Sequence, residues 1–145
     1  MQILRATQKT LLVVDDNEPL LEVVAEILET AGFRVLKANS GPSALKLAKE
    51  TEGEIHLLLS DVDMNGMSGP QLGQALKRIR PDIRIMFMSG GDNGNLLVLN
   101  YGWAYIEKPF VVMKLVEMVN NVLHSPDRSQ PGGYQFDTRK DTRQT

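Results

Sequence analysis

Residues 57–69 read LLLSDVDMNGMSG, an apolar run that leads into two acids and then into a glycine-containing turn. Near-continuous apolar sequence predicts a strand covered on both faces, as in the parallel sheet of an α/β domain. Asp61 and Asp63 lie at the carboxyl end of this strand. Each acid is either a reactive carboxylate or a polar residue that closes a buried strand. The choice depends on which other segments reach the same place.

Two kinds of segment alternate along the rest of the chain. Short stretches rich in branched or aromatic residues predict strands at 10–15, 34–38, 55–60, 83–88 and 104–106. Helical spacing of apolar residues predicts helices between them, with stripes formed by Leu20, Val23, Val24 and Ile27, by Leu72, Ala75, Leu76 and Ile79, by Val112, Leu115, Val116 and Val119, and more weakly by Ala44, Leu47 and Ala48. This alternation predicts an α/β fold with a parallel sheet and right-handed crossovers.

Capping residues support these limits. Gly32 follows the first helical stripe at the position where a helix commonly ends. Ser40 with Pro42, and Ser68 with Pro70, place a capping hydroxyl just before a proline that opens a helix. Helices are therefore expected to begin close to both serines.

The composition restricts the class of protein. A chain of 145 residues that is 42% hydrophobic and 23% charged suits one globular domain. A net charge of −2 gives no indication of a nucleic-acid partner or of membrane attachment. No cysteine is present, and no apolar run is long enough for a signal peptide or a membrane span. We therefore expect a cytoplasmic protein that does not insert into membranes.

The ends of the chain and one internal segment have weaker patterns. Residues 89–108 contain four glycines and one short apolar run, so the fourth helix is expected to be short or irregular. We expect an N-terminal extension at 1–8, the folded domain at 9–124 and a flexible tail at 125–145. We expect no second, output domain within these 145 residues.

Several polar residues follow the predicted strands. Asp15 and Asp16 end the first strand, Asp61 the third and Ser89 the fourth, and Lys108 follows the fifth. Ligands of open parallel sheets bind beyond the carboxyl ends of the strands. Three carboxylates, a hydroxyl and an ammonium group are therefore expected to converge on one edge of the sheet.

This set of groups indicates phosphoryl chemistry. Clustered carboxylates repel one another unless a cation compensates, and hard oxygen ligands suit Mg²⁺. Phosphoryl transfer needs mainly positioning and neutralisation of charge. An aspartate can serve as the covalent acceptor.

From about Lys9 to Leu123 the chain resembles the receiver domain of two-component response regulators. The matching segments are LLVVDDN at 11–17, LLLSDVDMNGMSGP at 57–70, IMFMSGG at 85–91 and YIEKPF at 105–110. The resemblance implies a three-layer, flavodoxin-like (βα)5 fold with strand order 2-1-3-4-5. It also implies that Asp61 accepts a phosphoryl group from the phosphohistidine of a sensor histidine kinase or phosphotransfer protein. The domain would then switch its binding of a downstream protein, as a signalling domain and not as an enzyme.

The resemblance also implies the roles of individual residues. Asp16, Asp61 and the main-chain carbonyl of Asp63 would hold Mg²⁺, and Asp15 would act mainly through metal-bound water. Ser89 and Lys108 would contact the phosphoryl oxygens. Ser89 and Tyr105 would form the switch. The Lys108–Pro109 peptide bond would be cis.

The chain departs from the family pattern at two positions after the acceptor. Members commonly have Met-Pro where this chain has Met64-Asn65, and we expect Asn65-Gly66 to form the turn without the proline. Asp63 adds a charge beside the phosphoryl site. The chain looks more like receivers attached to hybrid histidine kinases than like the prototype regulators.

Two alternatives remain open at this point. The segment DVDMNG at 61–66 also resembles the nucleophile motif of Mg²⁺-dependent phosphohydrolases of the haloacid-dehalogenase type. Against this, the motif follows the third strand and not the first, and the chain lacks a later acidic pair. The other alternative is a receiver-like module that binds partners without phosphorylation, which the complete set of acids disfavours.

Overall fold

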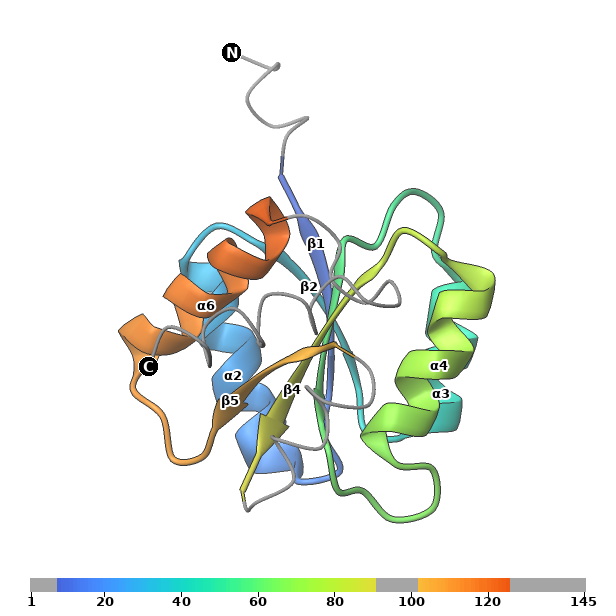
Figure 1. Cartoon of the computed structure of the whole chain (residues 1–145), viewed down its shortest axis with the longest axis horizontal. Coiled ribbons are helices and arrows are strands. Elements are labelled where there is room, and N and C mark those ends of the chain that lie inside the picture. The colour runs from blue at the N-terminus through green and yellow to red at the C-terminus, as the bar shows by residue number, and fades with distance from the viewer. Residues whose placement is uncertain (1–7, 91–101, 126–145) are drawn as a thin grey trace, which may run out of the picture.

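A computed structural model of the chain describes residues 8–90 and 102–125 (Figure 1). The described helices and strands, labelled as in Figure 1, are β1 (Thr10–Val14), α2 (Glu18–Thr30), β2 (Arg34–Ala38), α3 (Gly41–Glu50), β3 (Leu57–Asp61), α4 (Gly69–Ile79), β4 (Arg84–Ser89), β5 (Ala104–Glu107) and α6 (Val112–His124). The expected fourth helix, most of the N-terminal extension and most of the C-terminal tail lie outside the described residues.

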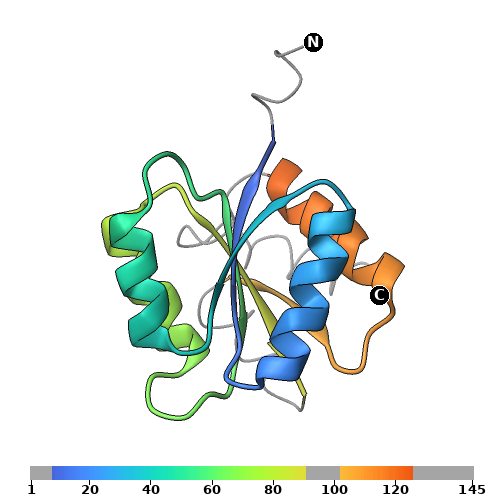
Figure 2. The same ribbon diagram turned by 180° about the vertical axis from the view of Figure 1, so that it is seen from behind.

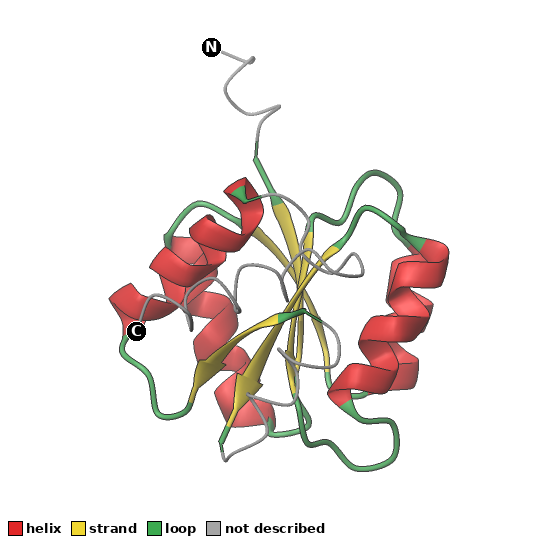
Figure 3. Cartoon of the chain, in the orientation of Figure 1, coloured by secondary structure: helices red, strands yellow, loops and turns green. Residues whose placement is uncertain are grey.

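The five strands form one parallel sheet in the order β2-β1-β3-β4-β5. Helices α2 and α6 cover one face of the sheet, and α3 and α4 cover the other (Figures 1 and 2). Every residue of β1 and β3 is buried, as expected for central strands between two helical layers. The predicted three-layer, flavodoxin-like arrangement is confirmed, and Figure 3 shows its alternation of strands and helices.

The two faces of the sheet have separate hydrophobic cores. On one face Leu58 and Phe87 pack in a cluster with residues of α3 and α4. On the other face Leu59 and Met86 pack with residues of α2 and α6. Successive strand residues point to opposite faces, so each central strand contributes to both cores. This double anchoring fixes the positions of the strand ends, which carry the polar residues identified above.

The predicted helix caps are present. Ser40 Oγ accepts a hydrogen bond from the Ser43 N–H at 3.1 Å. Ser68 forms a capping box in which its Oγ accepts from the Gln71 N–H at 3.2 Å and its own N–H donates to Gln71 Oε1 at 2.9 Å. After α2, Gly32 has a φ of 104°, a value that favours glycine.

The buried face of α2 differs from the predicted stripe. Of Leu20, Val23, Val24 and Ile27, only Val24 is buried, and Val23 is 52% exposed. The face against the sheet is formed by Leu21, Val24, Ala25 and Leu28. The helix is apolar over a wider arc than the sheet covers, so spacing alone did not identify the buried side. Leu20, Val23 and Ile27 instead line a hollow beside Lys108.

Candidate functional site

The carboxyl ends of the strands bring the predicted polar residues together. Asp15 directly follows β1, Asp61 is the last residue of β3, and Lys108 directly follows β5. Ser89, the last residue of β4, accepts the Lys108 N–H on its main-chain carbonyl at 2.8 Å. That bond fixes where Lys108 leaves the sheet, and it directs this residue to the same edge as the two acids.

The Lys108 ammonium group contacts both buried acids. Lys108 Nζ donates to Asp61 Oδ1 at 3.1 Å and lies 3.9 Å from Asp15 Oδ2. The Lys108 side chain is 26% exposed, whereas Asp15 is completely buried and Asp61 nearly so. Limited contact with water strengthens the attraction between these charges.

Asp15 is held in an environment that disfavours its charge. Its Oδ1 accepts a hydrogen bond from the Asn17 N–H at 2.9 Å, while its buried Oδ2 has no hydrogen-bond partner among the described residues. Burial raises the pKa of Asp15, and the hydrogen bond from Asn17 acts in the opposite direction. The nearby charge of Asp61 raises this pKa further, while that of Lys108 lowers it. A cation beside Oδ2 would give this oxygen a partner and would reduce the repulsion between Asp15 and Asp61.

Asp16 completes the acidic cluster from a more exposed position. Its Oδ2 accepts a hydrogen bond from the main-chain N–H of Asn65 at 3.0 Å. Asp15, Asp16 and Asp61 each offer a carboxylate oxygen, and these oxygens lie within 4.8 Å of one another. Three carboxylates at this spacing fit a hard divalent cation such as Mg²⁺, and one of them, Asp15, has a buried oxygen without a hydrogen-bond partner in the described part of the chain.

The loop after β3 is anchored at both ends. The Val62 N–H donates to the Met88 carbonyl at 3.0 Å, and the Gly69 N–H donates to the Val62 carbonyl at 2.9 Å. Between these bonds Gly66 has a φ of 79°, which agrees with the prediction that Asn65-Gly66 forms the turn without a proline. Asp63 is exposed on this loop.

Ser89 and Tyr105, the two predicted switch residues, lie on the neighbouring strands β4 and β5. Ser89 is buried and Tyr105 is half-buried against the core that α3 and α4 cover. The Lys108–Pro109 peptide bond is cis, as predicted. Sequence reasoning missed the main-chain donors of Asn17 and Asn65, because every residue except proline carries the same N–H.

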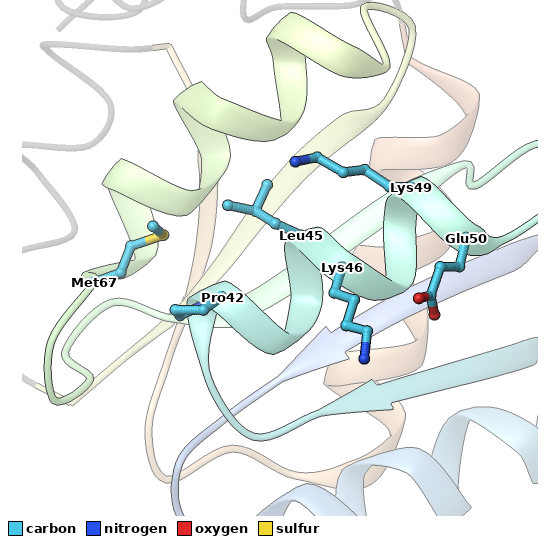
Figure 4. Close-up of a pocket in the computed structure, with 6 residues that line it drawn as sticks. All are labelled: Pro42, Leu45, Lys46, Lys49, Glu50 and Met67. Carbon is cyan, nitrogen blue, oxygen red and sulfur yellow. The ribbon is translucent and has the colours of Figure 1, made fainter.

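Two hollows lie beside helices that cover the sheet. One, of about 510 Å³, adjoins the acidic cluster through Lys108 and is lined by Leu20, Val23, Val24, Ile27, Gly90, Lys108, Pro109, Phe110 and Val112. The other, of about 390 Å³, lies beside α3 and is lined by Pro42, Leu45, Lys46, Lys49, Glu50 and Met67 (Figure 4). The predicted site residues do not line this second hollow. Of these two hollows, the one of about 510 Å³ is therefore joined to the candidate site, and it is called the groove beside Lys108.

No helix in the described ranges combines the length and apolar character that crossing a membrane requires.

The sequence matches the family model of the response regulator receiver domain over residues 11–120. It is 34% identical over 129 residues to the phosphate regulon transcriptional regulatory protein PhoB of Pseudomonas aeruginosa, covering 86% of this chain and 54% of PhoB. It is 31% identical over 121 residues to the sensor kinase CckA of Brucella abortus, covering 81% of this chain and 13% of the kinase. The chain thus spans only part of these curated relatives.

Solved structures show the same fold. The receiver domain of the hybrid histidine kinase CckA superposes with a TM-score of 0.68 at 32% identity, covering 79% of this chain and 99% of that domain. A response regulator receiver protein from Sinorhizobium medicae superposes with a TM-score of 0.73 at 26% identity, covering 83% of this chain and 98% of that protein. The predicted similarity to receivers of hybrid kinases is confirmed. The chain belongs to the response regulator receiver domain family.

Proposed function

We propose that Asp61 is the residue that accepts the phosphoryl group and that the donor is a protein phosphohistidine. The contact of 3.1 Å between Lys108 Nζ and Asp61 Oδ1 is the observation that carries this proposal. A carboxylate oxygen of Asp61 attacks phosphorus, a P–O bond forms, and the P–N bond to the donor imidazole breaks. The electron pair of the broken bond stays on the imidazole nitrogen, so the product is an aspartyl phosphate and a dephosphorylated donor.

Mg²⁺ is proposed as the cofactor, held by Asp16, Asp61 and the main-chain carbonyl of Asp63, with Asp15 acting mainly through water on the metal. The close carboxylates of Asp15, Asp16 and Asp61 support this assignment. When bound, the ion would neutralise negative charge on the phosphoryl oxygens. The chain's own residues would do the rest: Asp61 would be held by Lys108, and Asp15 would be kept in place by the Asn17 N–H.

The response to phosphorylation is assigned to Ser89 and Tyr105. Ser89 ends β4, which pairs with the strand that carries Asp61, and we propose that its hydroxyl contacts a phosphoryl oxygen. Tyr105 lies on β5 beside Phe87 of β4 and is half-buried, so the core does not fully enclose its ring. Phosphorylation would shift an existing equilibrium between inactive and active states, and the active state would bind the downstream protein.

The groove beside Lys108 is proposed as the surface that receives the phosphodonor protein. It is lined mainly by apolar side chains of α2 and of the segment that follows β5. Next to it Val111 is 68% exposed and Met113 is 82% exposed. Exposed apolar residues gathered beside a reactive group are typical of a protein-binding surface. A cytoplasmic location is part of the same proposal, as is the absence of a nucleic-acid partner.

Labelling by a small phosphodonor tests the proposal. The protein is incubated with Mg²⁺ and acetyl phosphate, and its intact mass is measured. We expect a gain of one alkali-labile phosphoryl group, absent in Asp61→Asn and retained in Asp63→Asn. Rapid turnover of many phosphate esters would favour the phosphohydrolase alternative instead. An unlabelled wild-type protein would favour a module that acts without phosphorylation.

A further inference from the structure

The main-chain N–H of Asn65 connects two loops that meet at the acidic cluster. It donates to Asp16 Oδ2 at 3.0 Å, and the two residues are 49 positions apart in the sequence. Asp16 lies in the loop between β1 and α2, whereas Asn65 lies in the loop between β3 and α4. The bond therefore ties the exposed acid of the cluster to the loop that carries Asp63.

Asp16 needs such a contact more than the other two acids do. Asp15 and Asp61 are buried, and Lys108 lies close to both of them. Asp16 is exposed, so its side chain is free to change rotamer unless a hydrogen bond holds it. Freezing a mobile side chain when it binds an ion costs conformational entropy. A bond already formed to Asn65 removes part of that cost before the ion arrives.

The identity of residue 65 determines whether this bond can form. The receivers that this chain resembles commonly have proline here, and proline has no N–H to donate. In this chain Asn65 retains the N–H, and Gly66 takes the positive φ of 79° that the turn requires. The donor is thus a property of this sequence and not of the family pattern.

We propose that the main-chain N–H of Asn65 positions the Asp16 carboxylate for Mg²⁺ and stays bonded to it when the ion is bound. A carboxylate has two oxygens, so Oδ2 keeps the hydrogen bond while Oδ1 is available to the ion. Asn65 acts only through Asp16 and is a positioning residue. This inference rests on the proposed function of the acidic cluster as a Mg²⁺ site.

Mg²⁺ affinity in matched variants tests the inference. Asn65→Pro removes the N–H, and Asn65→Ala keeps it while removing the side chain. Isothermal titration with Mg²⁺ alone should give wild-type affinity for Asn65→Ala and affinity about three- to tenfold weaker for Asn65→Pro, because the Asp16 side chain must then be ordered when the ion binds. The rate of labelling by acetyl phosphate should differ less between Asn65→Pro and wild type at saturating Mg²⁺ than at limiting Mg²⁺. Unchanged or tighter binding by folded Asn65→Pro overturns the inference.

The amide signal of Asn65 gives a second test that does not depend on the proline variant folding. In ¹H–¹⁵N spectra the Asn65 amide proton should move upfield in Asp16→Ala and should keep its hydrogen-bonded shift when wild-type protein is saturated with Mg²⁺. Loss of that shift on adding Mg²⁺ would show that the ion competes with Asn65, which contradicts the proposal. Failure of the wild-type protein to bind Mg²⁺ would instead overturn the proposed function.

Discussion

Lys108 donates to Asp61 across a separation of 47 residues, with 3.1 Å between Nζ and Oδ1. The same nitrogen lies 3.9 Å from Asp15 Oδ2, so one cation serves two buried carboxylates that come from different strands. Asp16 adds a third carboxylate oxygen within 4.8 Å of the others. The cluster therefore carries more negative than positive charge, and its chemistry depends on how that excess is balanced.

Replacing Lys108 with alanine should slow phosphorylation and destabilise the fold. Asp15 and Asp61 would lose the cation next to them, so labelling by acetyl phosphate should fall at least about tenfold at fixed Mg²⁺. Without Mg²⁺ the free energy of unfolding should drop by about 1–2 kcal/mol, less than for a fully buried pair because Lys108 is partly exposed. Mass spectrometry and urea unfolding measure the two effects. Lys46→Ala, an exposed lysine on α3, serves as the control and should match wild type.

The raised pKa of Asp15 predicts a pH dependence of stability. Burial is the largest cause of the raised pKa, and it keeps the Asp15 carboxyl of the folded protein protonated at pH values above its ordinary pKa of 3.8. Between 3.8 and the pKa in the folded state, the folded protein binds more protons than the unfolded chain. Its stability without Mg²⁺ should therefore decrease as the pH rises through this window.

The isosteric variant Asp15→Asn isolates this effect. It retains an oxygen that can accept the Asn17 N–H, but it carries no charge. At pH 7 without Mg²⁺ we expect Asp15→Asn to unfold at a temperature a few degrees above that of wild type. As the pH falls below the ordinary pKa of 3.8 and the wild-type carboxyl becomes protonated in both states, the difference should vanish. A variant less stable than wild type at pH 7 would show that the buried charge is already compensated.

Gly69 lies where a side chain would clash with β3, the strand that ends at Asp61. A Cβ at this position would lie 2.3 Å from the main-chain oxygen of Asp61 and 2.8 Å from a ring carbon of Phe87. Gly69→Ala should therefore lower the free energy of unfolding by about 2–3 kcal/mol and should reduce labelling as Asp61 shifts. Gly90→Ala is the control, because among the described residues its Cβ would meet only Lys108 Cδ, at 4.0 Å. Similar stabilities of the two variants in chemical denaturation would contradict this account.

If the groove beside Lys108 receives the phosphodonor protein, a substitution on this surface should slow phosphoryl transfer from a protein but not labelling by a small phosphodonor. Met113→Glu places a charge on the exposed apolar surface, so transfer from a phosphorylated histidine phosphotransfer protein should slow about tenfold or more. Labelling by acetyl phosphate should not change. Ile79→Glu is matched to it, because Ile79 is 42% exposed at the end of α4, on the other face of the sheet. Equal effects of the two variants on protein transfer would place the docking surface elsewhere.

The main features of the fold could be predicted because they follow from local rules. Central strands buried on both faces are almost continuously apolar, and β1 and β3 have that composition. Parallel strands place their carboxyl ends together, which is why Asp15, Asp61 and Lys108 could be predicted to meet. The strand order and the cis bond before Pro109 came from the family resemblance and not from these rules.

Other features depend on three-dimensional packing that a sequence pattern does not record. The buried side of α2 contains Leu21 and Leu28, whereas the predicted stripe included the exposed Val23, because the helix is apolar on more than one side. The bonds from the main-chain N–H groups of Asn17 and Asn65 left no signal, since the donors belong to the backbone. At Asn65 the sequence shows only that the donor is available, because residue 65 is not proline.

Chemical mapping of the phosphorylated residue shows which aspartate is the acceptor. Protein labelled with acetyl phosphate and Mg²⁺ is reduced with borohydride, which converts an aspartyl phosphate into homoserine, and its peptides are sequenced by mass spectrometry. We expect homoserine at position 61 and unmodified aspartate at Asp15, Asp16 and Asp63. Homoserine at any of those three positions, or labelling that persists in Asp61→Asn, would contradict the assignment of Asp61 as the acceptor.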